Sequence, residues 1–183
     1  MSHRLTSITT RTGDDGSTGL GDGSRVAKDC PRVRLLGDID ELNSQLGLLL
    51  CETLPAAVRT ALVDTQHDLF DLGGEIAVPG YQAIQDVQVL RLESWLAMLN
   101  ADLPPLREFV LPGGCRAAAL AHVARAVARR AERQAVTVAR EDILSPHALH
   151  YLNRLSDVLF VLARTLNAAV GAPDVLWRHQ RAR

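Results

Sequence analysis

The sequence has 183 residues with 20 basic and 21 acidic side chains, which give a formal net charge of −1 at pH 7. This balance argues against a generally basic protein that binds nucleic acids through its overall charge. Hydrophobic residues make up 47% of the chain, a share that argues against a largely disordered polypeptide. The length predicts one domain over residues 1–183.

The cysteines and the apolar runs indicate where the protein resides. Cys30, Cys51 and Cys115 are odd in number and widely spaced, which predicts reduced thiols in a cytoplasmic protein. Residues 1–10 are polar and lack the apolar stretch of a signal peptide. Residues 158–163 form one of the longest apolar runs, far below the ~20 residues that a membrane span needs. We therefore expect a cytoplasmic protein without a membrane segment.

Residues 1–31 are expected to form an irregular glycine-rich loop without β-strands, because they show no apolar alternation. Five stretches with helical spacing of apolar residues follow, and prolines such as Pro55 and Pro104 end them. Ser145 is the expected N-cap of the last helix. The predicted helices span residues 32–53, 56–76, 86–101, 115–140 and 146–170, and residues 171–183 form a docked or frayed tail. The sequence thus predicts an all-α, ferritin-like, five-helix up-and-down bundle over residues 32–170.

The predicted fourth helix concentrates arginine on one face. Residues 116–133 hold five Arg and one Glu, and Arg125, Arg129 and Arg133 lie on the side away from the apolar stripe. These like charges repel at a spacing of four residues, and arginine suits bidentate contacts with phosphate. The pattern predicts a site for a compact polyanion such as a triphosphate, with a second subunit as its other wall. A simply solvated helix face is the alternative.

Three other helices carry features that bear on the bundle. Asp40 lies opposite the apolar residues of the first helix. In the fifth helix, Asn153, Asp157 and Arg164 are predicted to share a polar face opposite the leucines. Leu90, Trp95 and Leu99 are the expected core residues of the third helix.

The N-terminal loop contains threonines between closely spaced glycines. Glycines let backbone N–H groups converge on phosphate oxygens, and threonine hydroxyls add donors. The loop is not a Walker A motif, because no Gly-Lys-Ser/Thr closes it. Lys28, downstream, can supply a point charge. A phosphate-binding loop and a flexible tail both fit this composition.

Taken together and in order, these motifs resemble the PduO-type ATP:cob(I)alamin adenosyltransferases. Four blocks carry the resemblance over nearly the whole chain. They are residues 10–20 (TRTGDDGSTGL), residues 37–47 (GDIDELNSQLG), residues 109–114 with 124–133 (FVLPGG, ARAVARRAER) and residues 151–164 (YLNRLSDVLFVLAR).

The resemblance implies a cobalamin adenosyltransferase-like fold and a homotrimer with active sites between subunits. It implies transfer of the 5′-deoxyadenosyl group of ATP to the cobalt of cob(I)alamin, with release of triphosphate. The implied substrates are ATP and cobalamin, and Mg²⁺ is the expected cofactor. A cobalamin reductase and an adenosylcobalamin-dependent acceptor enzyme are the protein partners that such a reaction needs.

The resemblance also assigns site residues. Phe109 is expected to press on the lower face of the corrin, and Asp40 to pair with Arg125 across the interface. Arg129 joins these three as the fourth candidate catalytic residue. Mg²⁺ is expected to bind through the phosphates of ATP, with Glu132 as the candidate protein ligand. ATP is expected to contact Thr10, Arg11, Thr12, Gly13, Thr18, Gly19, Lys28, Arg129, Arg130, Ala131, Glu132, Arg133 and Asn153.

Two positions depart from the pattern of these enzymes. Arg11 stands where they often have lysine and keeps the positive charge. Asp15 stands where they often have lysine or glutamate, so it either weakens ATP binding or faces solvent.

The residues alone leave two other functions open. A non-catalytic helical module with a basic face explains the arginines but not the threonine- and glycine-rich loop. A phosphotransferase acting on the γ-phosphate of ATP needs a Walker-type lysine or a kinase-like catalytic aspartate, and the sequence shows neither. Attack by Co(I), a very strong nucleophile, needs no general base, which agrees with the lack of a Ser/His/Asp or Cys/His pattern.

Overall fold

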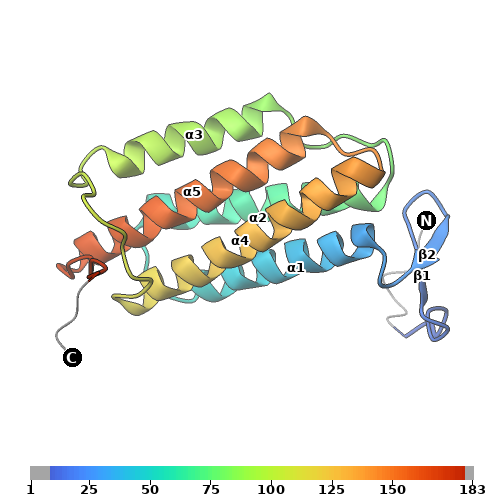
Figure 1. Ribbon diagram of the computed structural model, residues 1–183, viewed down its shortest axis with the longest axis horizontal. Helices are drawn as coiled ribbons and strands as arrows, with labels where there is room; N and C mark the ends of the chain where they lie inside the picture. The colour runs from blue at the N-terminus through green and yellow to red at the C-terminus, as the bar shows by residue number, and fades with distance from the viewer. Residues whose placement is uncertain (1–8, 180–183) are drawn as a thin grey trace.

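The computed structural model describes residues 9–179, so the part of the expected tail at residues 180–183 lies outside the described residues. Five helices alternate in direction and form an elongated bundle, with a small β-hairpin at one end (Figure 1). This arrangement confirms the predicted five-helix up-and-down bundle. The elements are β1 (Ser17–Gly19), β2 (Arg25–Ala27), α1 (Pro31–Leu50), α2 (Ala56–Ala77), α3 (Asp86–Asn100), α4 (Arg116–Glu141) and α5 (Pro146–Ala169).

Helix α4 packs between α1 and α5, while α2 lies against α1 and α3 against the outer side of α5 (Figure 1). Small side chains let helix axes approach closely, and the face of α4 toward its neighbours is made largely of alanine. The core leucines of α1 and α5 fill the space on either side, among them Leu42, Leu46, Leu152 and Leu159. None of the helices in the described part of the chain combines the length and hydrophobicity that a bilayer crossing requires. The fully buried alanines of α4 are Ala118, Ala121, Ala124, Ala128, Ala131 and Ala135.

Two details of the predicted helices differ in the structure. The first helix ends at Leu50 instead of residue 53, because the guanidinium of Arg59 binds the carbonyl oxygens of Leu50 and Glu52 at 2.8 and 2.9 Å. In α3 the expected core residue Leu90 is 58% exposed. This prediction was wrong because α3 buries a narrow face, carried by residues 89, 92 and 95.

The predicted cap of α5 is confirmed, since Ser145 Oγ accepts from the N–H of His147 at 3.1 Å.

A buried polar contact ties the outer helices together. The hydroxyl of Tyr151 on α5 donates to Asp68 on α2 at 2.8 Å, and Arg91 of α3 pairs with the same carboxylate. Burial, together with the adjacent Asp68 charge, raises the pKa of Tyr151 well above its ordinary value. The phenol is therefore a permanent donor, which suits a structural bond between α2 and α5.

The N-terminal segment contains a β-hairpin, which corrects the prediction of a loop without strands. Strands β1 and β2 pair antiparallel, with Thr18 opposite Val26. The periodicity was undetectable because each strand has three residues. The hairpin docks on the end of α2 through the N–H of Gly21, which donates to the carbonyl of Ala77 at 2.8 Å. A side chain at position 21 would collide with Val78, so this close approach requires glycine.

Candidate active site

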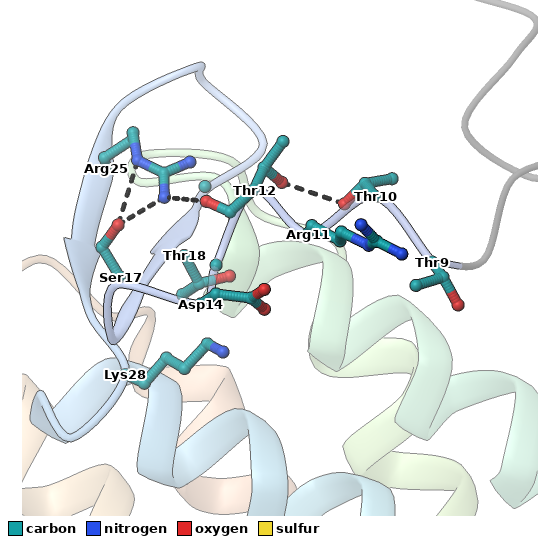
Figure 2. Close-up of a pocket in the computed structure, with 11 residues that line it drawn as sticks. Thr9, Thr10, Arg11, Thr12, Asp14, Ser17, Thr18, Arg25 and Lys28 are labelled. Carbon is teal, nitrogen blue, oxygen red and sulfur yellow. Dashed lines mark hydrogen bonds between the residues drawn. The ribbon is translucent and has the colours of Figure 1, made fainter.

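The N-terminal loop and hairpin enclose a cavity of about 400 Å³. Figure 2 shows Asp14, Thr18 and Lys28 grouped beside the loop that carries Thr10, Arg11 and Thr12. The seven residues of this segment that the sequence assigned to a phosphate site all line the cavity. The complete lining comprises Thr9, Thr10, Arg11, Thr12, Gly13, Asp14, Ser17, Thr18, Gly19, Arg25 and Lys28.

The backbone of this loop follows a tight path around Gly13. A Cβ atom at this position would lie 2.9 Å from the carbonyl oxygen of Ser17 and 3.1 Å from Nζ of Lys28. The N–H of Lys28 donates to Gly16 O at 2.9 Å, which fixes the lysine beside the loop. Arg11 adopts a φ of 58°, a conformation that non-glycine residues seldom take. The loop thus presents an ammonium group and backbone donors to one cavity, an arrangement suited to an anion.

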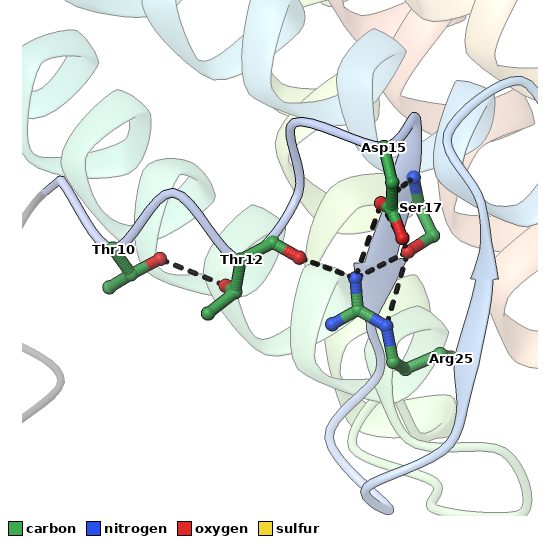
Figure 3. A network of polar contacts seen from close by, with 5 residues as sticks. All are labelled: Thr10, Thr12, Asp15, Ser17 and Arg25. Atoms are coloured by element: carbon green, nitrogen blue, oxygen red, sulfur yellow. Dashed lines mark hydrogen bonds and ion pairs between the residues drawn. The ribbon is translucent and has the colours of Figure 1, made fainter.

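Arg25 holds the loop from the opposite strand (Figure 3). One guanidinium nitrogen, Nη2, donates to Thr12 O at 2.6 Å and to the hydroxyl of Ser17, and Nε donates to the same hydroxyl at 3.1 Å. Asp15 accepts from the N–H and hydroxyl of Ser17 at 2.9 and 2.7 Å. These hydrogen bonds lower the pKa of Asp15. Asp15 therefore shapes the turn and faces solvent, outside the lining of the cavity.

The predicted cationic face of α4 is present in the structure. Arg129 and Arg133 are exposed and Arg125 is half-buried. Within residues 9–179, none of these three forms an ion pair with a carboxylate, and Nε of Arg125 is buried without a hydrogen-bond partner. Burial and then repulsion from Arg129 lower the pKa of Arg125. Such a face favours the binding of an anion, which would relieve both effects.

Glu132 and Asn153 face each other across α4 and α5. The side-chain amide of Asn153 donates to Oε1 of Glu132 at 2.9 Å. The amide fixes the orientation of the one carboxylate in the cationic segment. The structure therefore brings together these two residues, which the resemblance had assigned to the same site.

Arg130 and Ala131 point elsewhere. Nε of Arg130 donates to Asp38 of α1 at 2.9 Å, and the same guanidinium pairs with Glu41. These bonds raise the pKa of Arg130 and fasten α4 to α1. Ala131 has no exposed surface and belongs to the core. Their side chains are thus separated from Arg129, although the two residues adjoin it in sequence.

A larger cavity of about 630 Å³ lies near the start of α4. Phe109, whose side chain is 75% exposed, forms its rim, and Arg125 and Phe160 form its inner wall. The other lining residues are Leu106, Arg107, Glu108 and Val110. Arg125 and Phe160 also line an adjacent hollow of about 250 Å³ together with Arg129. A continuous surface therefore leads from the aromatic ring of Phe109 to the unpaired arginines.

The turn after Phe109 depends on Asn167 of α5. Its side-chain oxygen accepts from the N–H of Cys115 at 2.9 Å, and its amide donates to Gly113 O at 3.2 Å. Gly114 has a φ of +104°, and a Cβ there would overlap the amide of Asn167. Glycine is required at this position by conformation and by space.

Replacing Gly114 with alanine is expected to destabilise the fold by about 2–4 kcal/mol, because the added methyl group strains the backbone and displaces Asn167. Chemical denaturation measures the change. The matched control is Gly73→Ala in α2, where a methyl group meets no atom within 4 Å and is expected to stabilise the helix by about 0.5–1 kcal/mol. Equal stabilities of the two variants would contradict the role given to Asn167.

Arg164 corrects the predicted polar face of α5. Its side chain is buried, donates to Asp174 at 2.8 Å and to Pro104 O at 2.7 Å, and so joins two loops to the helix. The sequence placed Arg164 on a polar face opposite the leucines. In the structure, the loops that contain Pro104 and Asp174 cover this face of α5. The sequence predicted a tail that is either docked or frayed. Residues 174–179 are docked, since Leu176 forms a β-bridge with Val110.

The N-terminal hairpin and the start of α4, beside which the two cavities lie, are at opposite ends of the bundle (Figure 1). The hairpin precedes the start of α1. There the side-chain amide of Gln134, in the last third of α4, donates to Pro31 O at 2.9 Å. Phe109 precedes the start of α4. Because α4 has 26 residues, its two ends lie about 40 Å apart, which separates Phe109 from the loop along the bundle. Asp40 is exposed on α1, and no ion pair within the described residues joins it to Arg125.

Sequence reasoning missed four residues that shape these sites. Arg25 follows a glycine-rich turn, and Phe160 sits in an apolar run, so neither stood out. Asn167 gave a usable signal, because it is a polar residue within the leucine-rich spacing of α5. Trp177 lies within residues 171–183, which the sequence predicts only as a docked or frayed tail.

The chain is similar to known proteins over nearly its whole length. The profile of the family described as cobalamin adenosyltransferase matches residues 8–166. A cobalamin adenosyltransferase from Cupriavidus metallidurans is 58% identical over 182 residues, with 99% of each chain covered. A corrinoid adenosyltransferase from Mycobacterium leprae is 44% identical, with 97% of this chain and 98% of that protein covered.

The solved structures show the same likeness. A variant of the PduO-type ATP:corrinoid adenosyltransferase from Lactobacillus reuteri, complexed with cobalamin and ATP, superposes with a TM-score of 0.90. It is 34% identical in sequence, and the match covers 94% of this chain and 100% of that chain. The match spans most of the chain in both sequence and structure, and the chain therefore belongs to the cobalamin adenosyltransferase family.

Proposed function

We propose that the protein transfers the 5′-deoxyadenosyl group of ATP to the cobalt of cob(I)alamin and releases triphosphate. The observation that carries this proposal is the continuous surface from Phe109, at the rim of a cavity of about 630 Å³, to the unpaired Arg125 and Arg129. A cavity of this size with an aromatic rim suits a large planar ligand. The adjacent guanidinium of Arg129 suits a triphosphate.

The N-terminal loop is the proposed site for the phosphates of ATP. Lys28 supplies the point charge, and the hydroxyls of Thr10, Thr12 and Thr18 supply donors around the cavity of about 400 Å³. Arg129, Arg133 and Asn153 complete the nucleotide site from α4 and α5. Arg130 and Ala131 are proposed to support the nucleotide site indirectly by fixing the position of α4. The side chain of Arg130 contacts α1, and that of Ala131 lies in the core.

The reaction leaves the protein two tasks. Attack by Co(I) at C5′ of ATP forms the cobalt–carbon bond and breaks the bond from C5′ to the triphosphate oxygen, and the departing group takes the electron pair. The protein must hold these atoms in line and stabilise the charge that develops on the triphosphate. Arg129 is the residue proposed to stabilise that charge, and Arg125 lines the same hollow.

The residues present fit a Mg²⁺ ion beside the triphosphate. Asn153 engages only Oε1 of Glu132, so the second carboxylate oxygen can face an ion together with phosphate oxygens. Carboxylate and phosphate oxygens are the ligands that Mg²⁺ prefers. When bound, the ion would offset part of the negative charge of the phosphates.

Phe109 is proposed to act on the lower face of the corrin. Cobalt(II) that carries a lower ligand is hard to reduce, and a rigid apolar ring in the place of that ligand makes Co(I) more accessible. Phe109 is exposed at the cavity, and Asn167 holds the turn at Gly113 and Cys115 that follows it. A reductase that supplies the electron and an enzyme that accepts adenosylcobalamin are the partners this reaction requires.

A homotrimer with sites between subunits is the proposed assembly of this single domain. The nucleotide loop and Phe109 of one chain lie near opposite ends of α4, which are about 40 Å apart, too far for a single substrate complex. An adjoining subunit brings the two ends together. Asp40, exposed on α1, and Arg125, with its buried unpaired Nε, are the proposed ion pair across this contact.

One assay tests the proposed reaction. The protein is mixed with ATP, Mg²⁺ and chemically reduced cobalamin, and the absorbance spectrum and the phosphate products are followed. Adenosylcobalamin and triphosphate in equal amounts are the expected products. ADP or phosphate as the primary product would indicate a phosphotransferase, and the absence of turnover would indicate a binding module.

Replacing Arg25 with alanine is expected to raise the KM for ATP about three- to tenfold with a smaller change in kcat. The substitution removes the hydrogen bonds from Arg25 to Thr12 and Ser17, which hold the loop around ATP. Because the loop contacts ATP in the ground state and in the transition state, the loss of these bonds weakens binding more than it slows the chemical step. Steady-state kinetics with ATP as the varied substrate measure the effect. Arg34→Ala, an exposed position of α1 away from the loop cavity, is the control. An unchanged KM in the Arg25 variant would show that the loop holds its shape without this residue.

A further inference from the structure

The exposed ring of Phe109 requires support that its own segment does not provide. Its side chain is 75% exposed, and residues 104–115 between α3 and α4 contain no helix and no strand longer than a single bridge. An aromatic ring in such a segment can occupy several rotamers, whereas pressing on a corrin face needs one fixed position. The structure supplies the support from residues 174–179, which we call the C-terminal segment.

The C-terminal segment pairs with the backbone on both sides of Phe109. The N–H of Trp177 donates to the carbonyl oxygen of Phe109 at 2.7 Å, and the N–H of Leu111 donates to that of Val175 at 2.8 Å. Val110 and Leu176 form an antiparallel bridge between these bonds. The backbone of Phe109 is thus held as in a two-stranded sheet.

Trp177 also contacts the ring itself. The indole and the phenyl ring of Phe109 are 6.3 Å apart between centroids at an interplanar angle of 61°, an edge-to-face arrangement that aromatic pairs favour. On its other side the indole lies 3.9 Å from the ring of His179. Trp177 is therefore the aromatic neighbour of the exposed phenyl group and is itself packed.

A buried ion pair anchors this arrangement. Arg164 of α5 binds Asp174 at the start of the C-terminal segment and the carbonyl of Pro104 at the start of the segment that carries Phe109. The side chains of Arg164 and Asp174 are 5% and 17% exposed. The guanidinium of Arg164 thus holds the start of the C-terminal segment and the start of the segment that carries Phe109.

We propose that Trp177 is a positioning residue that holds Phe109 in the orientation needed to exclude the lower ligand of cobalt. This inference rests on the proposed function. It gives the end of the chain a role in the reduction step, through Phe109 and without contact to the nucleotide.

The test compares Trp177→Ala, Trp177→Phe and the control Arg178→Ala, an exposed neighbour in the same segment. The absorbance and electron paramagnetic resonance spectra of cob(II)alamin, recorded with ATP, report the fraction that lacks a lower ligand. Rates of product formation are measured from cob(II)alamin with a fixed chemical reductant and, separately, from cob(I)alamin reduced beforehand.

We expect Trp177→Ala to lower the fraction without a lower ligand and to slow the route from cob(II)alamin about ten- to hundredfold, the range that misplacement of a reacting group by ~1 Å produces. The KM for ATP and the route from cob(I)alamin should change much less. Trp177→Phe should restore most of the loss, and Arg178→Ala should match the native protein. A native spectrum and rate in Trp177→Ala, or an equal loss by both routes, would overturn the proposal.

Hydrogen exchange separates this inference from the proposed function. The amides of Leu111 and Trp177 should exchange faster in Trp177→Ala than in Arg178→Ala, whether or not the protein turns over. A native protein that forms no adenosylcobalamin would overturn the function, whereas unchanged exchange in Trp177→Ala would overturn the positioning role.

Discussion

Substitution of Arg129 by alanine is expected to lower kcat by about 10²–10³, because a preorganised charged donor to the departing group is lost. Arg129 is exposed, has no carboxylate partner in residues 9–179 and shares a hollow with Arg125. Its charge is therefore available to the triphosphate. Formation of adenosylcobalamin at saturating ATP and cob(I)alamin measures the effect.

Two further variants sharpen this result. Arg129→Lys keeps the charge but loses the planar fork, so an intermediate kcat is expected. Arg140→Ala, at the exposed last turn of α4, should retain the native kcat. If Arg129→Ala also retained it, the stabilisation of triphosphate by this helix face would be refuted.

Mixing two inactive variants is expected to restore activity. Lys28→Ala removes the charge of the nucleotide loop, and Arg129→Ala removes that of the facing helix. The two are co-expressed with different tags, and assemblies that carry both tags are purified. If each site takes its loop from one chain and its helix from the next, a ring of three with both variants has one intact interface. About one third of the native activity should then return.

The composition of the mixed rings does not change this expectation, because rings with either variant in excess contain one intact interface. Lys28→Ala chains that carry both tags serve as the control and should stay inactive. If Lys28 and Arg129 instead served one site within a single chain, no mixed ring would contain an intact site. Activity no higher than that of the control would therefore disprove sites shared between subunits.

The helices could be predicted because their signals are local. Apolar residues recur with helical spacing in all five, and Pro55 and the Ser145–Pro146 pair mark two of the boundaries. The early end of α1 could not be predicted, because Arg59 of the next helix binds its last carbonyl groups. The hairpin could not be predicted because three-residue strands are too short to show an alternation of apolar and polar residues.

The candidate site shows where motifs and spacing along a helix do not determine the contacts of a side chain. Arg129 and Arg130 are adjacent in sequence, yet one is exposed and the other is bound to Asp38 and Glu41. Arg164 was misplaced for a related reason, because loops from elsewhere in the chain cover its side of α5. Helical periodicity gives the direction of a side chain, but its partner depends on tertiary contacts far away in sequence.

The separation of the two cavities along α4 has a consequence for how the enzyme responds to dilution. Under the proposed assembly, a lone chain carries the nucleotide loop and Phe109 at opposite ends of the bundle and would contain no complete site. Catalysis would then depend on assembly, and assembly follows mass action. Specific activity should be constant at high protein concentration and fall below the concentration at which the proposed trimer dissociates. The amount of protein in the cell would then set both the number of active sites and the fraction of chains that form one.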